Sequence, residues 1–370
     1  MAKKLLIWLH LYVGLVAAFF LIALSVSGAV IAFEGELNRA FHPELTNVAP
    51  TGQPLNWDDF RARVERQSPG WKLVRIYFPD APDRSTYVRL RSVATRKTHH
   101  VYVNQYTGAI LGSTEDGSNW ILKVHDLHVN FLSGKVGNQI VLWSTCGLLL
   151  LSLSGIVLWW PRKVFRFQPS AAGPRLNRDI HYTVGFWSFL AMFAFAVTGL
   201  GLHYQTGKLL TLLNNASSAS ALPGHGTSIE GMLATAREAV PGAAIPRLLL
   251  PEAPGQPVFI YQRFPEDKTP AGRSFTTLDA KTGAVLSFGS SRTAPLLQTA
   301  LVQWTREIHT GTMLGLPTRI AASFFALMLT VLALTGPMIW WNKRRAVAKG
   351  RTALRIRAEA TAVVADEVPS

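Results

Sequence analysis

Four of the ten histidines in this 370-residue chain occupy corresponding positions beside long apolar stretches. His10 and His181 open two of these stretches, while His128 and His309 precede the other two. A neutral imidazole from each of two facing helices can supply both axial ligands of a b-type haem, whose iron accepts nitrogen donors and whose ring fills apolar space. The chemistry indicated by these residues is therefore haem binding and electron transfer.

The spacing around the four histidines is duplicated. His128 is followed by Gly134, Gly155 and Trp159-Trp160, and His309 is followed at the same intervals by Gly315, Gly336 and Trp340-Trp341. Likewise, His10, Gly14 and Gly28 correspond to His181, Gly185 and Gly199. Two copies in one orientation are related by a pseudo-twofold axis along the membrane normal. We therefore expect His10 to face His181, and His128 to face His309, with iron held through two haem b groups.

Small residues near the inner histidines support this interpretation. Gly14 and Gly185 follow His10 and His181 by one helical turn, so they lie on the same helix face and would leave room for a porphyrin edge. The alternative is that these histidines only anchor helix ends at the membrane interface. That alternative explains one such histidine more easily than four duplicated ones.

Two further histidines have no counterpart in the other copy. His125 corresponds to Arg306, and with His128 it forms His-Asp-Leu-His, whose spacing puts both imidazoles on one helix face, where they could hold a transition metal. His203 corresponds to Ala32 and could replace a member of the outer pair. A solvated polar role is the alternative for each.

Outer arginines are also candidate site residues. Arg306, Arg247 and Arg75 could pair with haem propionates or hold an anionic ligand, and surface salt bridges are the competing explanation.

The elements that must position these side chains begin with four apolar segments. No Asp, Glu, Lys or Arg occurs within residues 5–33, 136–160, 180–205 or 320–341, and Arg319 falls near the start of the fourth span, 317–341. A bilayer core needs about 20 apolar residues per helix. We therefore expect four transmembrane helices in two parallel repeats. The first follows Met1-Ala-Lys-Lys and is too long for a secretory signal, which favours a retained anchor.

The net charge of +15 is concentrated in a few short segments. Residues 1–4, the loop 161–179 and the tail 342–370 together hold 14 basic and 4 acidic residues. Basic segments beside membrane spans stay on the cytoplasmic side. The pattern predicts a multi-pass protein of a bacterial inner membrane with both termini cytoplasmic, and it argues against a nucleic-acid partner.

The two long segments between spans are nearly neutral and should lie outside the membrane. Residues 34–130 and 206–310 each predict a small α+β domain, with a helix at 57–67 or 229–239 followed by strands. Thr107-Gly108-Ala109 recurs as Thr282-Gly283-Ala284 and predicts a turn between the last two strands. Residues 118–130 and 294–309 predict a helix at the outer interface.

The residues that recur here resemble those of a known family. Leu9-His10 with Gly14 and Gly28, and Gly-Ile-Val-Leu-Trp-Trp-Pro-Arg at 155–162, resemble the PepSY-associated transmembrane family over about residues 5–345. The best analogues within it are inner-membrane reductases that release iron from siderophores by means of bound b-type haems. The resemblance implies PepSY-like outer domains and carries over His10, His128, His181 and His309 as haem ligands. Pro317 and Pro337 depart from the usual pattern of the fourth span.

These features together predict a haem-dependent ferric siderophore reductase. Electrons from quinol or another donor would enter near His10 and His181, pass to the haem near His128 and His309, and reduce an iron chelate held between the outer domains. No nicotinamide, flavin or covalent haem motif occurs. The inner and outer histidines would lie about 30 Å apart, which is long for direct transfer.

Two other function classes remain open. A non-enzymatic PepSY scaffold or sensor that regulates a periplasmic partner would hold no cofactor. A transporter of haem or metal is disfavoured, since no span shows an interrupted helix pair at its middle.

Overall fold

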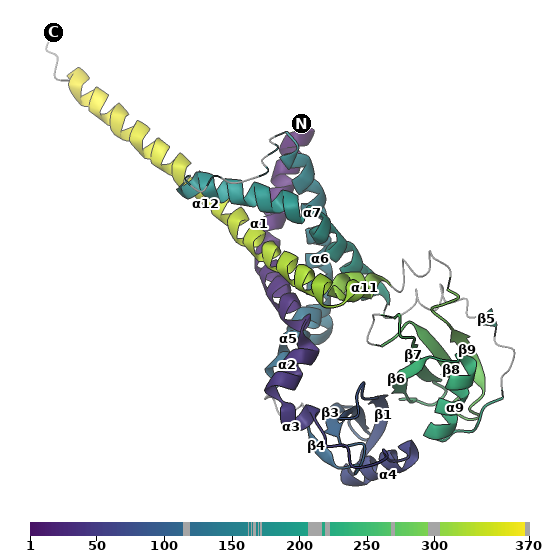
Figure 1. Cartoon of the computed structure of the whole chain (residues 1–370). Coiled ribbons are helices and arrows are strands. Elements are labelled where there is room, and N and C mark those ends of the chain that lie inside the picture. The colour runs from purple at the N-terminus through teal and green to yellow at the C-terminus, as the bar shows by residue number, and fades with distance from the viewer. Residues whose placement is uncertain are drawn as a thin grey trace. The chain divides into compact units, whose positions relative to one another are not determined.

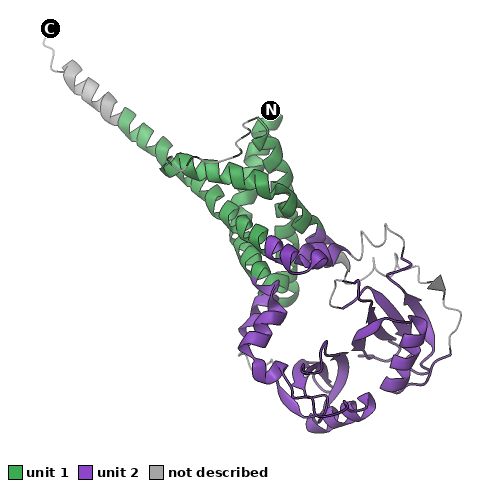
Figure 2. Cartoon of the chain, viewed as in Figure 1, with its two compact units in different colours: residues 1–29, 127–197, 323–370 green, residues 30–126, 198–322 purple. Residues whose placement is uncertain are grey.

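The computed structural model describes the chain except for residues 114–118, 162, 164, 166, 167, 169, 171, 206–216, 219–222, 268–270, 295–303 and 367–370. The chain forms two compact units (Figure 2). Unit 1 comprises residues 1–29, 127–197 and 323–370, and unit 2 comprises residues 30–126 and 198–322. Each unit therefore collects segments from both halves of the sequence.

Four long helices supply most of unit 1 (Figure 1). They are α1 (Ala2–Ile31), α6 (Gly134–Trp159), α7 (Gly173–Gln205) and α12 (Leu316–Asp366). All four contain a stretch that is long and apolar enough to cross a membrane, as predicted. Two bounds differ from the prediction, because α7 begins inside the predicted loop 161–179 and α12 continues through Pro337 into the predicted tail.

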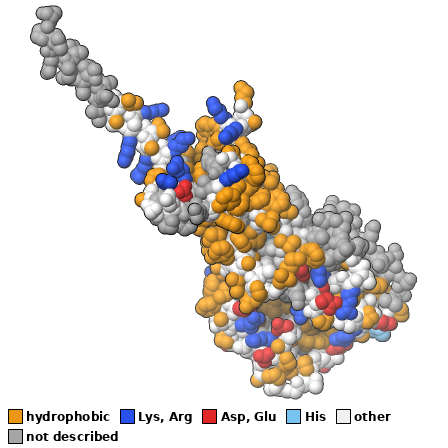
Figure 3. Space-filling model, turned by 45° about the horizontal axis from the view of Figure 1, so that its top comes forward, with side chains coloured by type: hydrophobic (Ala, Val, Ile, Leu, Met, Phe, Trp, Pro, Cys, Tyr) orange, Lys and Arg blue, Asp and Glu red, His pale blue; other side chains and the backbone are white. Residues whose placement is uncertain are grey.

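Unit 1 has a small, tightly packed core. It is formed by Ala17, Ala18, Leu21, Leu148, Met192, Ala196, Leu329 and Ala333. Helices α1 and α6 are in contact at Gly147, where an added Cβ would meet Val13 at the ordinary van der Waals distance of 3.5 Å. The Ser25 and Thr330 hydroxyls join α1 to α12 at 2.6 Å. Outside this core, apolar side chains cover the surface, as a bilayer requires (Figure 3).

Lys and Arg side chains are concentrated at one end of unit 1. Lys163 lies over the ring of Trp160 at 5.1 Å, and Arg344 lies over the ring of Trp340 at 4.7 Å. Figure 3 shows Lys and Arg side chains where α12 leaves the other helices. Aromatic rings beside basic residues are typical of the membrane–water interface.

Unit 2 contains one nine-stranded antiparallel sheet. Its strands are β1 (Trp71–Tyr77), β2 (Thr86–Ser92), β3 (Thr98–Val103), β4 (Ile110–Ser113), β5 (Ser217–Ser218), β6 (Ala244–Leu249), β7 (Val258–Arg263), β8 (Ser274–Leu278) and β9 (Val285–Gly289). Their spatial order is β4-β3-β2-β1-β6-β7-β8-β9-β5. The predicted turns are confirmed, with Gly108 at φ 74° and Gly283 at φ 73°.

The two outer segments, predicted as separate domains, share this sheet. Strands β1 and β6 pair antiparallel in its middle, where Ile76 lies opposite Leu248. Each strand would otherwise expose a row of unpaired backbone groups, and their pairing removes both edges. One hydrophobic core, which includes Ile76, Leu248, Val88 and Ile260, therefore runs under both halves.

Helices α4 (Trp57–Gln67) and α9 (Ile229–Ala239) cover one face of the sheet and match the predicted ranges. Their first turns cap each other. Asp58 accepts from the backbone N–H of Ile229 at 2.7 Å, and Glu230 accepts from that of Trp57 at 3.0 Å. Carboxylates are favourable there, because the first N–H groups of a helix have no internal partner.

Short helices complete unit 2 and its boundaries. They are α2 (Glu34–Phe41), α3 (Pro43–Thr46), α5 (Trp120–Asn130), α11 (Trp304–Thr310) and the 3-10 helix η2 (Thr312–Leu314). Helix α5 confirms most of the predicted helix 118–130. Of the predicted helix 294–309, residues 304–309 are helical and residues 295–303 lie outside the described residues.

Candidate functional site

The two inner histidines are held in the same way. His10 on α1 has its Nδ1 2.8 Å from the hydroxyl of Ser154 on α6. His181 on α7 has its Nδ1 2.8 Å from the hydroxyl of Thr335 on α12. Each imidazole is thus fixed to a hydroxyl on another spanning helix, more than a hundred residues away in the chain.

The hydroxyls also define which ring nitrogen carries the proton. Ser154 donates to the carbonyl of Leu150 at 2.6 Å, and Thr335 donates to that of Val331 at 2.7 Å. A hydroxyl has one proton to donate, so each accepts the bond from its histidine. We infer that Nδ1 is protonated in His10 and His181 and that Nε2 carries the lone pair. Among the described residues, neither Nε2 has a hydrogen-bond partner.

The outer histidines are anchored through the same nitrogen. Nδ1 of His128 on α5 lies 3.1 Å from the Ser27 hydroxyl and 3.0 Å from the Leu24 carbonyl of α1. A carbonyl only accepts, so this Nδ1 is protonated too. Nδ1 of His309 on α11 lies 3.0 Å from the hydroxyl of Thr198 on α7. All four predicted ligands therefore have Nδ1 bound to a Ser or Thr on another helix.

A glycine follows each of these four hydroxyl residues. The dipeptides are Ser27-Gly28, Ser154-Gly155, Thr198-Gly199 and Thr335-Gly336. A Cβ on Gly28, Gly155 or Gly336 would lie 2.9, 3.3 or 3.5 Å from Cε1 of His128, His10 or His181 respectively. The hydroxyl orients the ring in all four cases, and at Gly28 and Gly155 the absence of a Cβ also makes room for it.

This role was not predicted, since these glycines served only as markers of the repeat. Gly14 and Gly185 were predicted to leave room for a porphyrin edge, and that stays a prediction. In the structure those two face Leu151 and Leu332, at 3.6 and 3.7 Å from an added Cβ. The recurrence of Ser/Thr-Gly within four apolar segments was a signal that could have identified the residues beside each imidazole.

Both inner histidines lie within unit 1, His10 on α1 and His181 on α7. Their pairing across one haem stays a prediction. His128 belongs to unit 1 and His309 to unit 2, and each is anchored inside its own unit. The predicted facing of His128 and His309 remains a prediction.

A match to a known protein family covers nearly the whole chain. The family model of the PepSY-associated transmembrane region matches residues 7–343. The chain belongs to this family. The resemblance seen in its histidine, glycine and Trp-Trp positions is thereby confirmed, and a comparison with curated proteins finds no significant match.

In this PepSY-associated protein, His125 is engaged with an acid. Its Nδ1 lies 2.7 Å from the carboxylate of Glu34, at the start of α2. That hydrogen bond raises the pKa of His125 above its usual range, although burial and the charge of Arg306 act against it. The alternative for His125 is a metal ion that it would hold together with His128. The described residues contain no group of three or more His, Cys, Asp or Glu that could hold a metal ion, so no third ligand supports this alternative.

The other two additional candidates lie in unit 2. Arg306 on α11 is near enough to Arg247 of the sheet for its charge to act there. His203 lies in the last turn of α7. Nearby, Gly201 lets α7 and α11 approach, since an added Cβ would lie 2.8 Å from Thr305.

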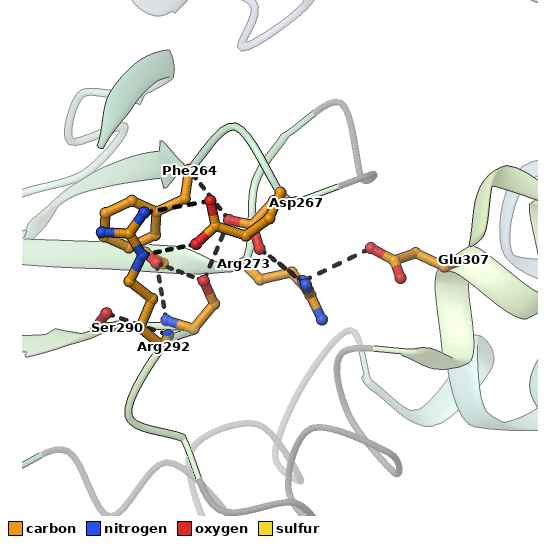
Figure 4. A network of polar contacts seen from close by, with 9 residues as sticks. Phe264, Asp267, Arg273, Ser290, Arg292 and Glu307 are labelled. Carbon is orange, nitrogen blue, oxygen red and sulfur yellow. Dashed lines mark hydrogen bonds and ion pairs between the residues drawn. The ribbon is translucent and has the colours of Figure 1, made fainter. Parts of the chain in front are cut away.

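A buried ion network links the sheet of unit 2 to α11, which carries His309 (Figure 4). Arg273 contacts Asp267 at 2.9 Å and Glu307 at 3.7 Å. Both carboxylates are almost completely buried, with exposed fractions of 0% and 3%. Because buried charges need partners, this network holds α11 against the segment between β7 and β8.

The His125–Glu34 pair predicts a pH dependence of stability. A histidine whose folded pKa is raised stabilises the fold fully below its unfolded pKa, and the contribution is lost as pH rises through the folded pKa. We expect His125→Gln to lower the thermal midpoint more at about pH 5.5 than at about pH 9. Thermal unfolding of the full chain in detergent measures this, with His225→Gln, in an exposed pair with Glu238, as the control. Equal losses at both pH values would contradict the prediction.

Proposed function

We propose that this membrane protein is a b-type haem protein that transfers electrons to a ferric siderophore or a similar iron chelate on the outer side of a bacterial inner membrane. The observation that carries the proposal is the shared anchoring of His10, His128, His181 and His309 through Nδ1. Histidines that bind iron through Nε2 commonly donate Nδ1–H to a neighbouring acceptor, which fixes the ring and makes Nε2 a better donor.

The residues fit haem better than a bare metal ion. Haem supplies four equatorial nitrogens itself and needs only one or two axial ligands from the protein. His10 and His181 lie in the same unit, and the Nδ1 contacts of both leave the lone pair of Nε2 for iron. His10 and His181 would hold one haem, and its iron would supply one-electron transfer. The second proposed pair is His128 with His309.

The net reaction needs a donor and leaves the chelator intact. Quinol, or another reduced carrier, gives up electrons, and each iron(III) in a chelate accepts one. Quinol oxidation releases two electrons and two protons and would therefore reduce two chelates. Hard oxygen donors hold iron(III) far more strongly than iron(II), so one added electron weakens the complex and frees the metal.

We further propose that the two halves are copies of one unit, with both termini cytoplasmic. The equivalent anchors Ser154 and Thr335, and Ser27 and Thr198, support the duplication. The cations beside Trp160 and Trp340 support the orientation.

An absorption spectrum of the detergent-purified protein tests the proposal. We expect the spectrum of a b-type haem that changes on reduction with dithionite, at about two haems per chain. A quinol analogue should then support reduction of a ferric chelate, followed with a colorimetric trap for iron(II). Protein produced with ample haem that contains none would contradict the proposal and favour the scaffold or sensor.

A further inference from the structure

The sheet of unit 2 has one face that α4 and α9 do not cover. Buried core residues alternate with half-buried residues along β2 and β7. Because successive side chains of a strand point to opposite faces, the half-buried residues lie on the face away from α4 and α9, here called the open face. The strand register places these in two rows. One row runs Tyr102, Tyr87, Tyr77, Arg247, Tyr261 and Phe275, and the other contains His100, Arg89 and Arg75.

The three arginines of this face lack acidic partners. Among the described residues, Arg75, Arg89 and Arg247 form no ion pair with a carboxylate. The Nε of Arg75 and that of Arg247 are buried without any hydrogen-bond partner. The salt-bridge explanation considered for Arg75 and Arg247 is therefore not supported. A buried N–H without an acceptor is costly, and the oxygens of an anionic ligand would supply acceptors for Arg75 and Arg247.

Aromatic rings hold Arg247 in place. Its guanidinium carbon lies 4.4 Å from the ring centre of Tyr261 and 5.1 Å from that of Tyr77. Such stacking uses the planar faces of the guanidinium and leaves its N–H edge for hydrogen bonds. Arg75 donates from Nη1 to the Tyr77 hydroxyl at 3.2 Å, so the two arginines share this tyrosine.

His100 and Tyr102, which lie beside the arginines on this face, do not neutralise their positive charge. Arg89 donates to Nε2 of His100 at 2.6 Å. Burial, together with the charges of Arg89 and Arg75, lowers the pKa of His100 to about 4, so this imidazole is neutral at physiological pH. Burial, and secondarily the charge of Glu34, raises the pKa of Tyr102 to about 12, so its hydroxyl keeps its proton. The open face therefore presents cations and hydrogen-bond donors.

We infer that the open face of the sheet binds an oxygen-rich organic anion, namely a ferric chelate that retains net negative charge on carboxylate or similar oxygen donors. Arg75, Arg89 and Arg247 would contact its outer oxygens, while the tyrosine row packs against its organic part. The inference names the substrate class of the proposed function and rests on that function for the electron transfer. Binding itself requires no haem.

Gallium(III) citrate is a probe that separates binding from reduction. Gallium(III) takes the same hard oxygen ligands as iron(III) but does not accept an electron under these conditions. We expect titration calorimetry of the full chain to show binding that weakens with added salt. Arg247→Gln should raise Kd about tenfold, and Arg75→Gln with Arg247→Gln about a hundredfold, because charge-assisted hydrogen bonds are lost.

Arg63→Gln is the matched control. It removes the same charge from α4, on the covered side of the sheet, where Arg63 donates only to the Thr107 carbonyl. If the double glutamine variant does not fold, Arg75→Lys with Arg247→Lys keeps the charge, removes the planar fork and should still raise Kd.

Three outcomes would overturn the inference. They are no binding of gallium citrate at low salt, an equal loss in Arg63→Gln, and an unchanged Kd in the folded Arg75/Arg247 variants. If the third outcome came with loss of haem, the arginines would be assigned to haem propionates. Gallium binding in protein without haem would instead leave this inference standing while the proposed electron transfer failed.

Discussion

Replacing His181 by alanine should lower the haem content of the purified protein from about two per chain to about one. His10→Ala should lower it equally, because both imidazoles would bind the same iron. Combining the two changes should cause no further loss, since residues that act on one group are not additive. The haem-to-protein ratio, taken from the reduced absorption spectrum, measures all three variants.

His225→Ala serves as the control for haem content, since His225 lies in an exposed pair with Glu238. A full loss of both haems from either single variant, or a larger loss in the double variant, would contradict a shared inner site. Thr335→Val tests the anchoring separately. It should retain haem with an altered midpoint potential, because Nδ1 of His181 loses its acceptor, and Thr335→Ser should restore the original potential.

Replacing Arg273 by methionine should destabilise the sheet of unit 2 by about 3–5 kcal/mol. Methionine fills similar space but removes the cation that the buried carboxylates of Asp267 and Glu307 share. Among the described residues, Asp267 would retain its hydrogen bonds from the Phe264 N–H and the Ser291 hydroxyl. Hydrogen exchange of the backbone amides of β8 and β9 in the full chain reports the free energy of opening.

Arg292→Met is the matched control for this change. Arg292 pairs with Glu266 at 2.6 Å, but both side chains are about half exposed, at 55% and 51%. Solvent screens such pairs, so exchange rates in this variant should stay close to those of the unchanged protein. Similar acceleration in the Arg273 and Arg292 variants would show that burial of the network has no special importance.

The spans and the outer secondary structure could be predicted because their signals are local. Helices 57–67 and 229–239 were predicted at the observed bounds, since their amphipathic pattern repeats within one or two turns. The four candidate histidines could be selected from the sequence because they recur at matching intervals, and their role as ligands stays a prediction. Helix α12 continues past its predicted end because no proline occurs between Pro337 and Pro369, and Gly350 alone does not end the helix.

Interactions between distant residues were decided by the tertiary structure. Pairing of β1 with β6 depends on which strand edges meet, and neither strand encodes its neighbour. The open face with Arg75, Arg89 and Arg247 follows from that pairing, because register places a side chain on one face or the other.

The same division holds at the candidate site. The sequence by itself determined that histidines stand at both ends of the predicted spans. Only the structure decided that each Nδ1 meets a Ser or Thr hydroxyl, and hence that Nε2 carries the lone pair in His10 and His181. The physical reason is that a hydrogen bond between residues more than a hundred positions apart depends on how each helix is rotated and packed. Local sequence patterns carry little information about that rotation.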